Sequence, residues 1–320
     1  MKIYIEYDLA NESGKGKFLA RLTKEWSRTG EVKYSSKPNG CDARLCLTRF
    51  RTKSKLPTVL RIDGAHNEAA KGKKKRRVEA SLRWKNKETG NSIKGSKAVI
   101  YQSDYCRKMG HAIFGAKAKR EYVIFNGADP AEFKQREVGT KNVIMMAYWK
   151  NRPHKRLAEM VAVARQYTEI DPEARFYVLG ETECPPIAPK NLTYCGHLNR
   201  DQIAEHLSKA ACMLNISYAD WCPNAVVEAL VAGVPVICTK GHGVSEIVNQ
   251  SGIVLDIDDI PPANPKNFKR ATNPQIKDFA PVYGAIKEIL EGGKVFPVPE
   301  HLHISRIAKQ YAEVFRAVVK

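Results

Sequence analysis

The 320-residue sequence has no run of about 18 apolar residues, which a membrane-spanning helix requires. Residues 1–7 alternate apolar and polar side chains as a first strand does, and they lack the apolar core of a signal peptide. The eight cysteines form no C-x-x-C pair and show no spacing typical of a disulfide framework. We therefore expect a protein of the reducing cytoplasm, either in solution or peripherally at the inner face of the membrane.

Acidic residues are scarce in the first half of the chain. Residues 1–140 hold 32 lysines and arginines against 15 aspartates and glutamates, whereas residues 141–320 hold 21 against 19. The densest basic run, residues 71–77, is by itself as typical of a solvated loop as of a binding site. Because the excess spreads over the whole first half, it predicts a polyanionic partner, either nucleic acid or an anionic membrane surface.

No group of His, Cys, Asp and Glu residues shows metal-ligand spacing, so we expect no essential metal and no cofactor. The D-x-D sequence at residues 256–258 follows a predicted strand and precedes Pro261 and Pro262. We interpret it as a solvated turn.

Short strands and helices alternate along the chain. This pattern predicts an α/β protein with parallel sheets covered by helices, built as doubly wound domains. The predicted strands are residues 3–7, 58–62, 99–103, 123–129, 143–149, 175–179, 192–195, 212–216, 234–237 and 252–255, and the predicted helices are 18–26, 157–167, 200–211, 280–290 and 304–319. A polar segment at 134–142 is typical of a linker, which gives a basic domain 1–138, a second domain 139–300 and a C-terminal helix 301–320.

The most informative segment is residues 220–236, D-W-C-P-N-A-V-V-E-A-L-V-A-G-V-P-V. Pro223 suits the first helical position, the residues after it are apolar on nearly every helical face, and Gly233 stands where a helix ends. Glu228 interrupts this apolar helix, and a buried carboxylate is costly unless it is paired or faces a ligand site. Asp220 lies just before the helix, whose first N–H groups favour an anion. The segment therefore predicts a ligand with both phosphate and hydroxyl groups.

At these residues the chain resembles the retaining glycosyltransferases of the GT-B fold, in the large family numbered four, the group 1 glycosyl transferases. Their hallmark is an acid, seven residues and a Glu, followed by a segment like residues 228–236; here the first acid is Asp220 rather than the usual Glu. Residues 61–64 (R-I-D-G), 101–103 (Y-Q-S) and 126–129 (N-G-A-D) match further family motifs in order. The resemblance implies two Rossmann-like domains facing across a cleft, with a C-terminal helix that crosses back to the first domain.

The resemblance also implies a set of donor-binding residues. Glu228 would hold the ribose hydroxyls, Asp220 would contact the transferred sugar, and Lys155 would bind the phosphates. The family's usual arginine is absent, since Trp149 stands at its position, and either Lys150 or Arg152 would replace it. Further contacts to the donor are expected at the helix start, from Cys222, Asn224 and Ala225. Gly196, at a strand end beside the nucleotide base, and Gly14, in a glycine loop after the first strand, are also expected to contact the donor.

The implied reaction is transfer of a sugar, with retention of configuration, from a UDP- or GDP-linked donor to an acceptor hydroxyl. Asp63 ends the predicted strand 58–62 and His66 follows it, so either side chain could orient that hydroxyl. The charge leaves two acceptors equally open: nucleic acid, such as DNA with hydroxyl-bearing modified bases, and a membrane-associated saccharide. A non-catalytic nucleic-acid-binding protein on a transferase fold is the alternative, which the intact Glu228 and Lys155 disfavour.

Overall fold

The computed structural model describes the chain except residues 12, 66–74, 147–152, 183–187, 258–274 and 293, and it leaves the side chains of 75–80 undescribed. The chain divides into two compact units, which are treated separately below. Unit 1 comprises residues 1–129 and 300–320, and unit 2 comprises the described residues between them. Among the described residues, no helix is both long and apolar enough to cross a membrane.

Unit 1 is built on a sheet of six parallel strands in the order β2-β1-β3-β4-β5-β6. Its three central strands are buried along their whole length, as expected when helices cover both faces of a parallel sheet. The order of the strands reverses between β1 and β3. The strands are β1 (Lys2–Ile5), β2 (Lys33–Ser35), β3 (Ala43–Leu47), β4 (Thr58–Ile62), β5 (Ala98–Tyr101) and β6 (Glu121–Val123).

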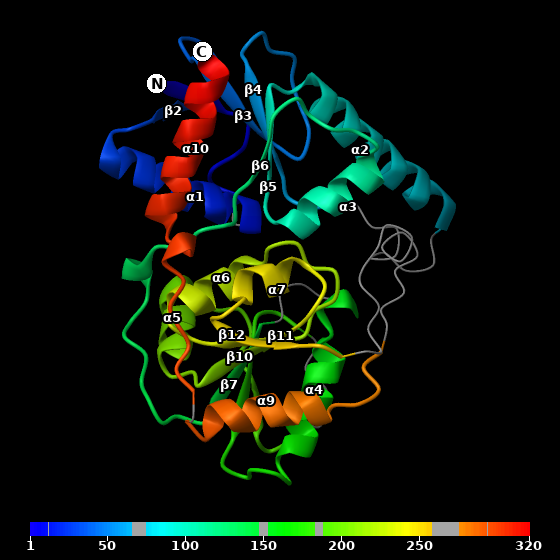
Figure 1. Ribbon diagram of the computed structural model, residues 1–320, viewed down its shortest axis with the longest axis vertical. Coiled ribbons are helices and arrows are strands. Elements are labelled where there is room, and N and C mark those ends of the chain that lie inside the picture. Colours follow the sequence, from blue (N-terminus) through cyan, green and yellow to red (C-terminus); the bar gives the residue numbers. More distant parts are fainter. Residues whose placement is uncertain (12, 66–74, 147–152, 183–187, 258–274, 293) are drawn as a thin grey trace. The chain divides into compact units, whose positions relative to one another are not determined.

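Helices α1 (Gly14–Thr29) and α10 (Ile304–Val319) cover one face of this sheet, and α2 (Lys75–Gly95) and α3 (Asp104–Phe114) cover the other (Figure 1). The Ser13 side chain caps the start of α1 by accepting a hydrogen bond from the Gly16 N–H, and Gly30 ends the helix with φ +68°. This cap starts α1 four residues before the predicted helix 18–26, so the expected glycine loop is largely the first turn of a helix.

The C-terminal helix α10 completes the core of unit 1. Its buried apolar side chains pack on α1, where the rings of Phe18 and Tyr311 lie 5.7 Å apart and those of Trp26 and Phe315 lie 6.2 Å apart. The Trp26 indole N–H also donates to the carbonyl of Ala308 at 3.1 Å. Residues more than 280 positions apart in sequence therefore share one core.

Unit 2 has a second sheet of six parallel strands, in the order β12-β11-β10-β7-β8-β9, which reverses between β7 and β10. Helices α4 (Leu157–Tyr167) and α9 (Ala280–Leu290) cover one face, and α6 (Asn224–Val231) and α7 (Gly243–Val248) cover the other (Figure 1). The remaining elements are β7 (Asn142–Met146), β8 (Arg175–Leu179), β9 (Leu192–Tyr194), β10 (Cys212–Asn215), β11 (Val236–Thr239), β12 (Gly252–Leu255), α5 (Arg200–Ser208) and the single turns η2 (Pro130–Glu132), η3 (Pro153–Lys155) and η4 (Glu300–Leu302).

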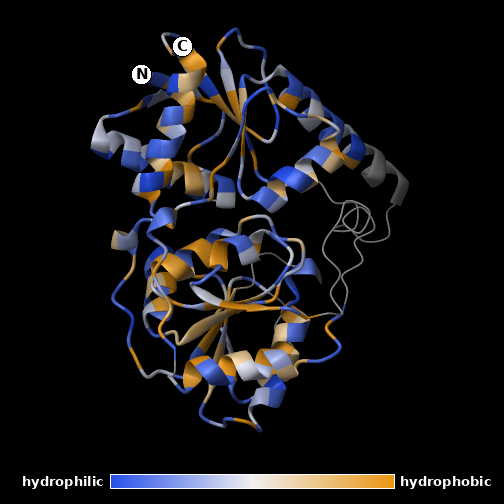
Figure 2. Ribbon diagram, viewed as in Figure 1, coloured by the Kyte–Doolittle hydropathy of each residue, from blue (hydrophilic) through white to orange (hydrophobic). Residues whose placement is uncertain are grey.

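The predicted α/β class with two doubly wound domains is confirmed. Helix α6 is coloured largely as hydrophobic in Figure 2, and it is buried at nearly every position, as its composition indicated. Several local predictions were wrong by a few residues; the strand predicted at 123–129, for example, is β6 and ends at Val123. Pro223 adopts an extended ψ of 129° and precedes the helix, which begins at Asn224. The predicted strand 99–103 stops at Tyr101, because the Ser103 side chain caps α3 by accepting from the Cys106 N–H.

The packing of α1 against α10 in unit 1 can be tested by replacing a buried and an exposed tryptophan. Replacing the fully buried Trp26 by Ala should lower the free energy of unfolding by about 3–5 kcal/mol, since it leaves a cavity between α1 and α10. Replacing Trp84, which is 55% exposed on α2, should cost less than about 1 kcal/mol. Urea unfolding followed by circular dichroism checks both values, and equal losses would contradict the assignment of Trp26 to the core.

Candidate active site

Doubly wound sheets bind ligands at the carboxyl ends of their strands, where the strand order reverses. In unit 2 this point lies between β7 and β10, and the segments that follow these strands carry Lys155 and Asp220. In unit 1 it lies between β1 and β3, and the segments that follow carry Lys15 and Thr48. Each pair is in contact, so a lysine bridges the reversal in both sheets.

In unit 2, the Lys155 ammonium donates to Asp220 Oδ2. The Trp221 N–H donates to Asp220 Oδ1 at 3.0 Å, and the Ser217 hydroxyl donates to Oδ2 at 3.4 Å. Burial alone would raise the pKa of Asp220, but the neighbouring Lys155 outweighs it and holds this pKa below its ordinary value. Asp220 is therefore an anion at neutral pH although its side chain is only 14% exposed.

The backbone around Lys155 and Asp220 is fixed by its neighbours. Arg156 is fully buried with the left-handed φ of +53°, and its guanidinium lies 5.3 Å from the centre of the Tyr218 ring. The Tyr218 N–H donates to the His154 carbonyl at 2.6 Å, which joins the two segments on either side of the reversal. The Gly243 N–H donates to the Asp220 carbonyl at 3.0 Å and ties α7 to the same place.

Helix α6 begins directly after this pair. Its N-terminus lies at the carboxyl edge of the sheet, where the dipole and first N–H groups of a helix favour an anion. Glu228, only 7% exposed, lies at the start of the second turn. Gly233 follows the helix with φ +78°, as predicted for its C-terminal end. Two carboxylates, one lysine and a helix N-terminus thus share one small region.

His242 lies beside this region but is suited to packing. Its side chain is 2% exposed, its Nε2 lies 3.1 Å from the Thr239 hydroxyl, and its ring meets that of Tyr218 edge-on. Burial lowers its pKa to about 4 although the Asp220 charge opposes this. His242 is therefore neutral at pH 7.

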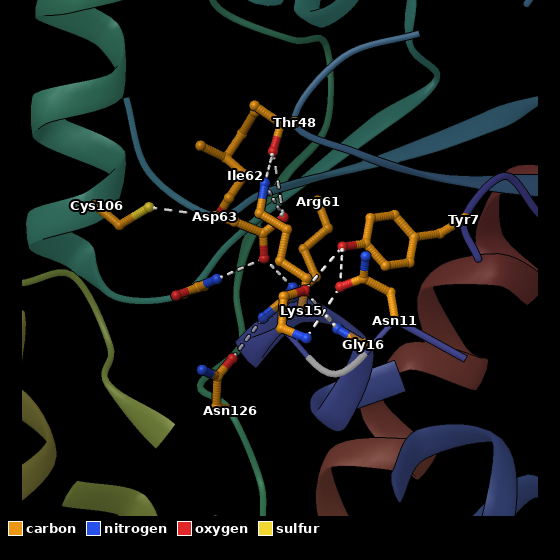
Figure 3. A network of polar contacts seen from close by, with 12 residues as sticks. Tyr7, Asn11, Lys15, Gly16, Thr48, Arg61, Ile62, Asp63, Cys106 and Asn126 are labelled. Carbon is orange, nitrogen blue, oxygen red and sulfur yellow. Dashed lines mark hydrogen bonds and ion pairs between the residues drawn. The ribbon is translucent and has the colours of Figure 1, made fainter. Parts of the chain in front are cut away.

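In unit 1, the three motifs that follow β4, β5 and β6 interlock in one polar network (Figure 3). Arg61 forms a buried ion pair with Asp63 and donates to Asn126 Oδ1 at 2.6 Å. Gln102 donates to Asp63 Oδ1 at 2.8 Å, and Thr48 donates to Oδ2 at 3.4 Å. The side chain of Asp63 is 3% exposed, so both its oxygens are engaged and almost covered.

Lys15, in the first turn of α1, reaches into the same network (Figure 3). Its ammonium donates to the Thr48 hydroxyl at 2.5 Å and lies 3.6 Å from Asp63 Oδ2, while its side chain is 37% exposed. Burial, and after it the positive charge of Arg61, lowers the pKa of Lys15 to about 8. A lysine with this pKa can bind an anion when it is charged and accept a proton when it is neutral.

The comparisons with known proteins agree with this geometry. A family profile described as glycosyl transferases group 1 matches residues 140–273. Residues 140–273 are therefore similar to the group 1 glycosyl transferases. The match spans Lys155, Asp220 and Glu228, the three side chains around the strand reversal of unit 2. No curated protein matches the chain.

Solved structures of glycosyltransferases resemble this chain over nearly its whole length. HepE from Anabaena, crystallised with UDP and glucose, is 14% identical with a TM-score of 0.64, covering 99% of this chain and 100% of that one. Sucrose-phosphate synthase from Thermosynechococcus elongatus is 13% identical with a TM-score of 0.62, covering 100% and 94%. WaaG, involved in lipopolysaccharide biosynthesis, is 11% identical with a TM-score of 0.61, covering 98% and 99%. At such identities the likeness establishes the fold, and the predicted GT-B class is confirmed.

The structure gathers most of the predicted donor-binding residues in one part of unit 2. Cys222, Asn224 and Ala225 lie at the start of α6, close in sequence to Asp220 and Glu228. Gly196 follows β9 with φ +66°, and its carbonyl accepts from the Gly180 N–H at 2.9 Å. The roles assigned to all of them stay predictions.

The remaining predicted site residues either have a different local structure from the expected one or lie outside the described residues. Gly14 is the first residue of α1 rather than part of a loop, because Ser13 already caps the helix there. His66, Lys150 and Arg152 lie outside the described residues. Within the described chain, no group of three or more His, Cys, Asp or Glu residues could hold a metal ion; the expected independence from metal stays a prediction.

The bridge between Lys15 and Thr48 was missed by sequence reasoning. Ser13 followed by a helix-compatible run was the available signal for a helix start, and it would have placed Lys15 in the first turn. Thr48 follows β3, a strand that the pattern concealed because it contains Arg44, which is buried in an ion pair with Glu6.

The depressed pKa of Lys15 predicts a pH dependence of stability. The unfolded chain binds the Lys15 proton up to its ordinary pKa of 10.5, whereas the folded protein releases it near pH 8. Between these values the unfolded state holds more protons, so this group makes the free energy of unfolding rise with pH. Lys15→Met should remove that rise.

Urea unfolding of the wild type, Lys15→Met and the exposed control Lys33→Met between about pH 7 and 10.5 measures this effect. The control should keep the wild-type pH profile. Identical profiles for wild type and Lys15→Met would show that folding does not lower the pKa of Lys15.

Proposed function

We propose that this protein is a glycosyltransferase that moves a sugar from a UDP- or GDP-linked donor to an acceptor hydroxyl, with retention of configuration and without an essential metal. The observation that carries the proposal is the arrangement in unit 2: Asp220, Glu228 and Lys155 around the N-terminus of α6, at a strand reversal. A nucleotide sugar presents the two kinds of group that this arrangement suits, a diphosphate and several hydroxyls.

The diphosphate leaving group needs positive charge and N–H donors as negative charge develops on it. Lys155 supplies the charge, and the N-terminus of α6 supplies a favourable dipole. Lys155 pairs with Asp220 in this structure, but Asp220 also accepts from Ser217 and Trp221. Asp220 therefore keeps hydrogen-bond donors when the Lys155 ammonium turns to a phosphate.

The two carboxylates suit different parts of the donor. Glu228 is buried one turn inside α6, and a carboxylate there can accept two hydrogen bonds from the neighbouring hydroxyls of a ribose. Asp220 stays ionised, and its negative charge would stabilise the positive charge that develops on the sugar ring during transfer. Retention itself rests on the family resemblance.

The network of unit 1 supports an acceptor role for that unit. Asp63 is held by Arg61 and Gln102, so we assign it the task of positioning Lys15 and Thr48. Lys15 is the more exposed partner, and with a pKa of about 8 it can take up the proton that the acceptor hydroxyl loses. The acceptor is a polyanion or lies on an anionic surface, as the charge of the first half indicates.

Glu228→Gln should abolish transfer and donor hydrolysis while leaving the fold intact. The amide carries no negative charge and has one acceptor oxygen, so it cannot replace the two carboxylate oxygens that would accept from the ribose hydroxyls. A panel of UDP- and GDP-linked sugars, incubated with wild type and variant, checks this by release of the nucleoside diphosphate. The anomeric configuration of the released or transferred sugar tests retention. Full turnover by Glu228→Gln would contradict the site, and no turnover of any donor by wild type would favour the non-catalytic alternative.

Independence from metal can be tested at the D-x-D sequence. Asp256 is 63% exposed and pairs with Lys240 at 2.6 Å, as a solvated turn allows, whereas Asp258 lies outside the described residues. Asp256→Asn should keep wild-type turnover, and addition of EDTA should leave turnover unchanged. Loss of activity with EDTA that manganese or magnesium restores would overturn the proposal of a metal-free reaction.

A further inference from the structure

We propose that unit 1 docks nucleic acid along α2 and the adjoining residues 49–55, so that the acceptor in the proposed transfer is a nucleic-acid polymer. The acceptor role rests on the function proposed above, whereas the docking surface stands on its own observations. These are a concentrated charge, an elongated basic surface, stacked arginines and a small polar pocket.

The whole formal net charge of the chain belongs to unit 1. Residues 1–129 and 300–320 hold 34 lysines and arginines against 15 acidic residues, a net charge of +19. Residues 130–299 hold 19 of each, a net charge of zero. The charge therefore follows the structural division of the chain even more closely than its halves indicated.

The charge of unit 1 includes an elongated surface, which we call the basic strip. Residues 49–55 leave the carboxyl end of β3 and run beside α2 toward the start of β4. The Phe50 N–H donates to the Ser92 hydroxyl of α2 at 2.9 Å, which fixes the two segments side by side. The strip consists of Arg49, Arg51, Lys53 and Lys55 from the loop and Arg83, Lys87 and Lys94 from α2.

The length of the strip fits a polymer. In helix α2 the strip runs from Arg83 to Lys94, which at 1.5 Å per residue is about 17 Å, or roughly five nucleotide steps of a duplex. The N-terminus of α2 lies at the carboxyl edge of the sheet, the edge that carries Lys15 and Asp63. A polynucleotide bound along the strip would thus run toward the proposed acceptor site of the same unit.

The lysines of the strip are available for phosphate. Lys53, Lys55, Lys87 and Lys94 make no ion pair with any residue that the structure describes. The neighbouring Glu6 is buried and accepts from the Thr52 N–H, the Arg51 N–H and Arg44, so it does not reach these lysines. Such uncompensated charges are the kind that release counterions from nucleic acid on binding.

Three arginines of this region stack on aromatic rings. Arg44 lies 4.6 Å from the ring centre of Phe50, Arg49 5.3 Å from that of Trp84, and Arg51 5.4 Å from that of Tyr7. Stacking fixes the plane of a guanidinium group. The Arg44 guanidinium is buried and donates to Glu6 and Thr58, whereas Arg51 is exposed, so that its N–H edge can bind a phosphate.

A pocket of about 440 Å³ lies at the end of the strip, near the start of β4. Arginine, lysine and hydroxyl groups line it together with one aromatic ring, and this composition suits a phosphate group. Its lining includes Arg44, Phe50, Arg51, Thr52, Lys53 and Ser54.

Nucleic acid explains the strip better than an anionic membrane does. Peripheral membrane binding requires an exposed apolar face, but the large apolar residues of α1 are fully buried against α10 and the sheet. The large hydrophobic side chains exposed in the described part of unit 1 are Tyr34, Trp84, Val123 and Val319, of which only Trp84 borders the strip. A single indole among arginines is suited to stack on a base.

The test compares two triple variants with equal loss of charge. Lys53→Ala/Lys87→Ala/Lys94→Ala removes charge from the strip, and Lys33→Ala/Lys37→Ala/Lys309→Ala removes it from exposed positions on β2, the segment after it and α10. Fluorescence anisotropy with a labelled DNA duplex, without donor, measures affinity between about 50 and 200 mM salt. The strip variant should bind roughly tenfold or more weakly, and its slope of log affinity against log salt should fall by about 2–3.

The control variant should retain nearly the wild-type affinity and slope. Equal losses in both variants would show that charge alone, and not the strip, attracts DNA. Binding of wild type to vesicles of phosphatidylcholine and phosphatidylglycerol, with no binding to DNA, would overturn the proposal in favour of a membrane surface. Circular dichroism of each variant verifies that the fold is kept.

Hydrolysis of the nucleotide-sugar panel separates this proposal from the proposed function. The strip variant should hydrolyse donor at the wild-type rate, since none of its three lysines belongs to the site in unit 2. DNA binding without any donor hydrolysis would refute the transferase function and leave the docking surface standing. Donor hydrolysis without DNA binding would refute the docking surface and leave the transferase function standing.

Discussion

The structure depends on how a parallel sheet behaves where its strand order reverses. Two loops then leave the sheet in diverging directions, and the gap between them must be closed by side chains or filled by a ligand. Both units close it with a lysine: Lys155 reaches Asp220 in unit 2, and Lys15 reaches Thr48 and lies near Asp63 in unit 1. A charged partner holds each loop in place, yet an anion can compete for the same ammonium group, so one interaction serves both the fold and the binding of a substrate.

The surroundings of the two lysines differ in a way that suits different tasks. The Lys155 ammonium pairs with one carboxylate, that of Asp220, which also accepts a hydrogen bond from the Trp221 N–H. The positive charge of Lys155 is therefore balanced by one negative charge. Lys15 shares Asp63 with the buried Arg61, and burial together with this second cation lowers its pKa to about 8. The first arrangement suits a permanent cation that stabilises a leaving phosphate, and the second suits a group that exchanges a proton.

Local sequence predicted the parts of this fold whose determinants lie close together in the chain. The bounds of α4, α9 and α10 and the position of Gly233 follow from apolar periodicity and end signals within a few residues. Strand β3 escaped prediction because it contains a buried arginine, and the partners that satisfy Arg44 lie elsewhere in the chain, Glu6 38 positions and Thr58 14 positions away. The contact of Lys15 with Thr48, 33 positions apart, escaped for the same reason. The residues of the site could be named from motifs, but which of them touch is set by strand order, which no local pattern contains.

The position of α10 has a consequence for biosynthesis. The core of unit 1 needs Phe315 and Tyr311 against Trp26 and Phe18, but the 170 residues from 130 to 299 are translated between its two parts. Residues 30–303 separate α1 from α10, so at typical elongation rates the apolar face of α1 waits for roughly 14–55 s before its partner exists. Unit 2 is translated within that interval and can fold during it. A chain that stops within unit 2 therefore exposes an open core in the first unit, and chaperones and proteases can recognise it before a strongly basic, half-assembled domain meets the cell's nucleic acids.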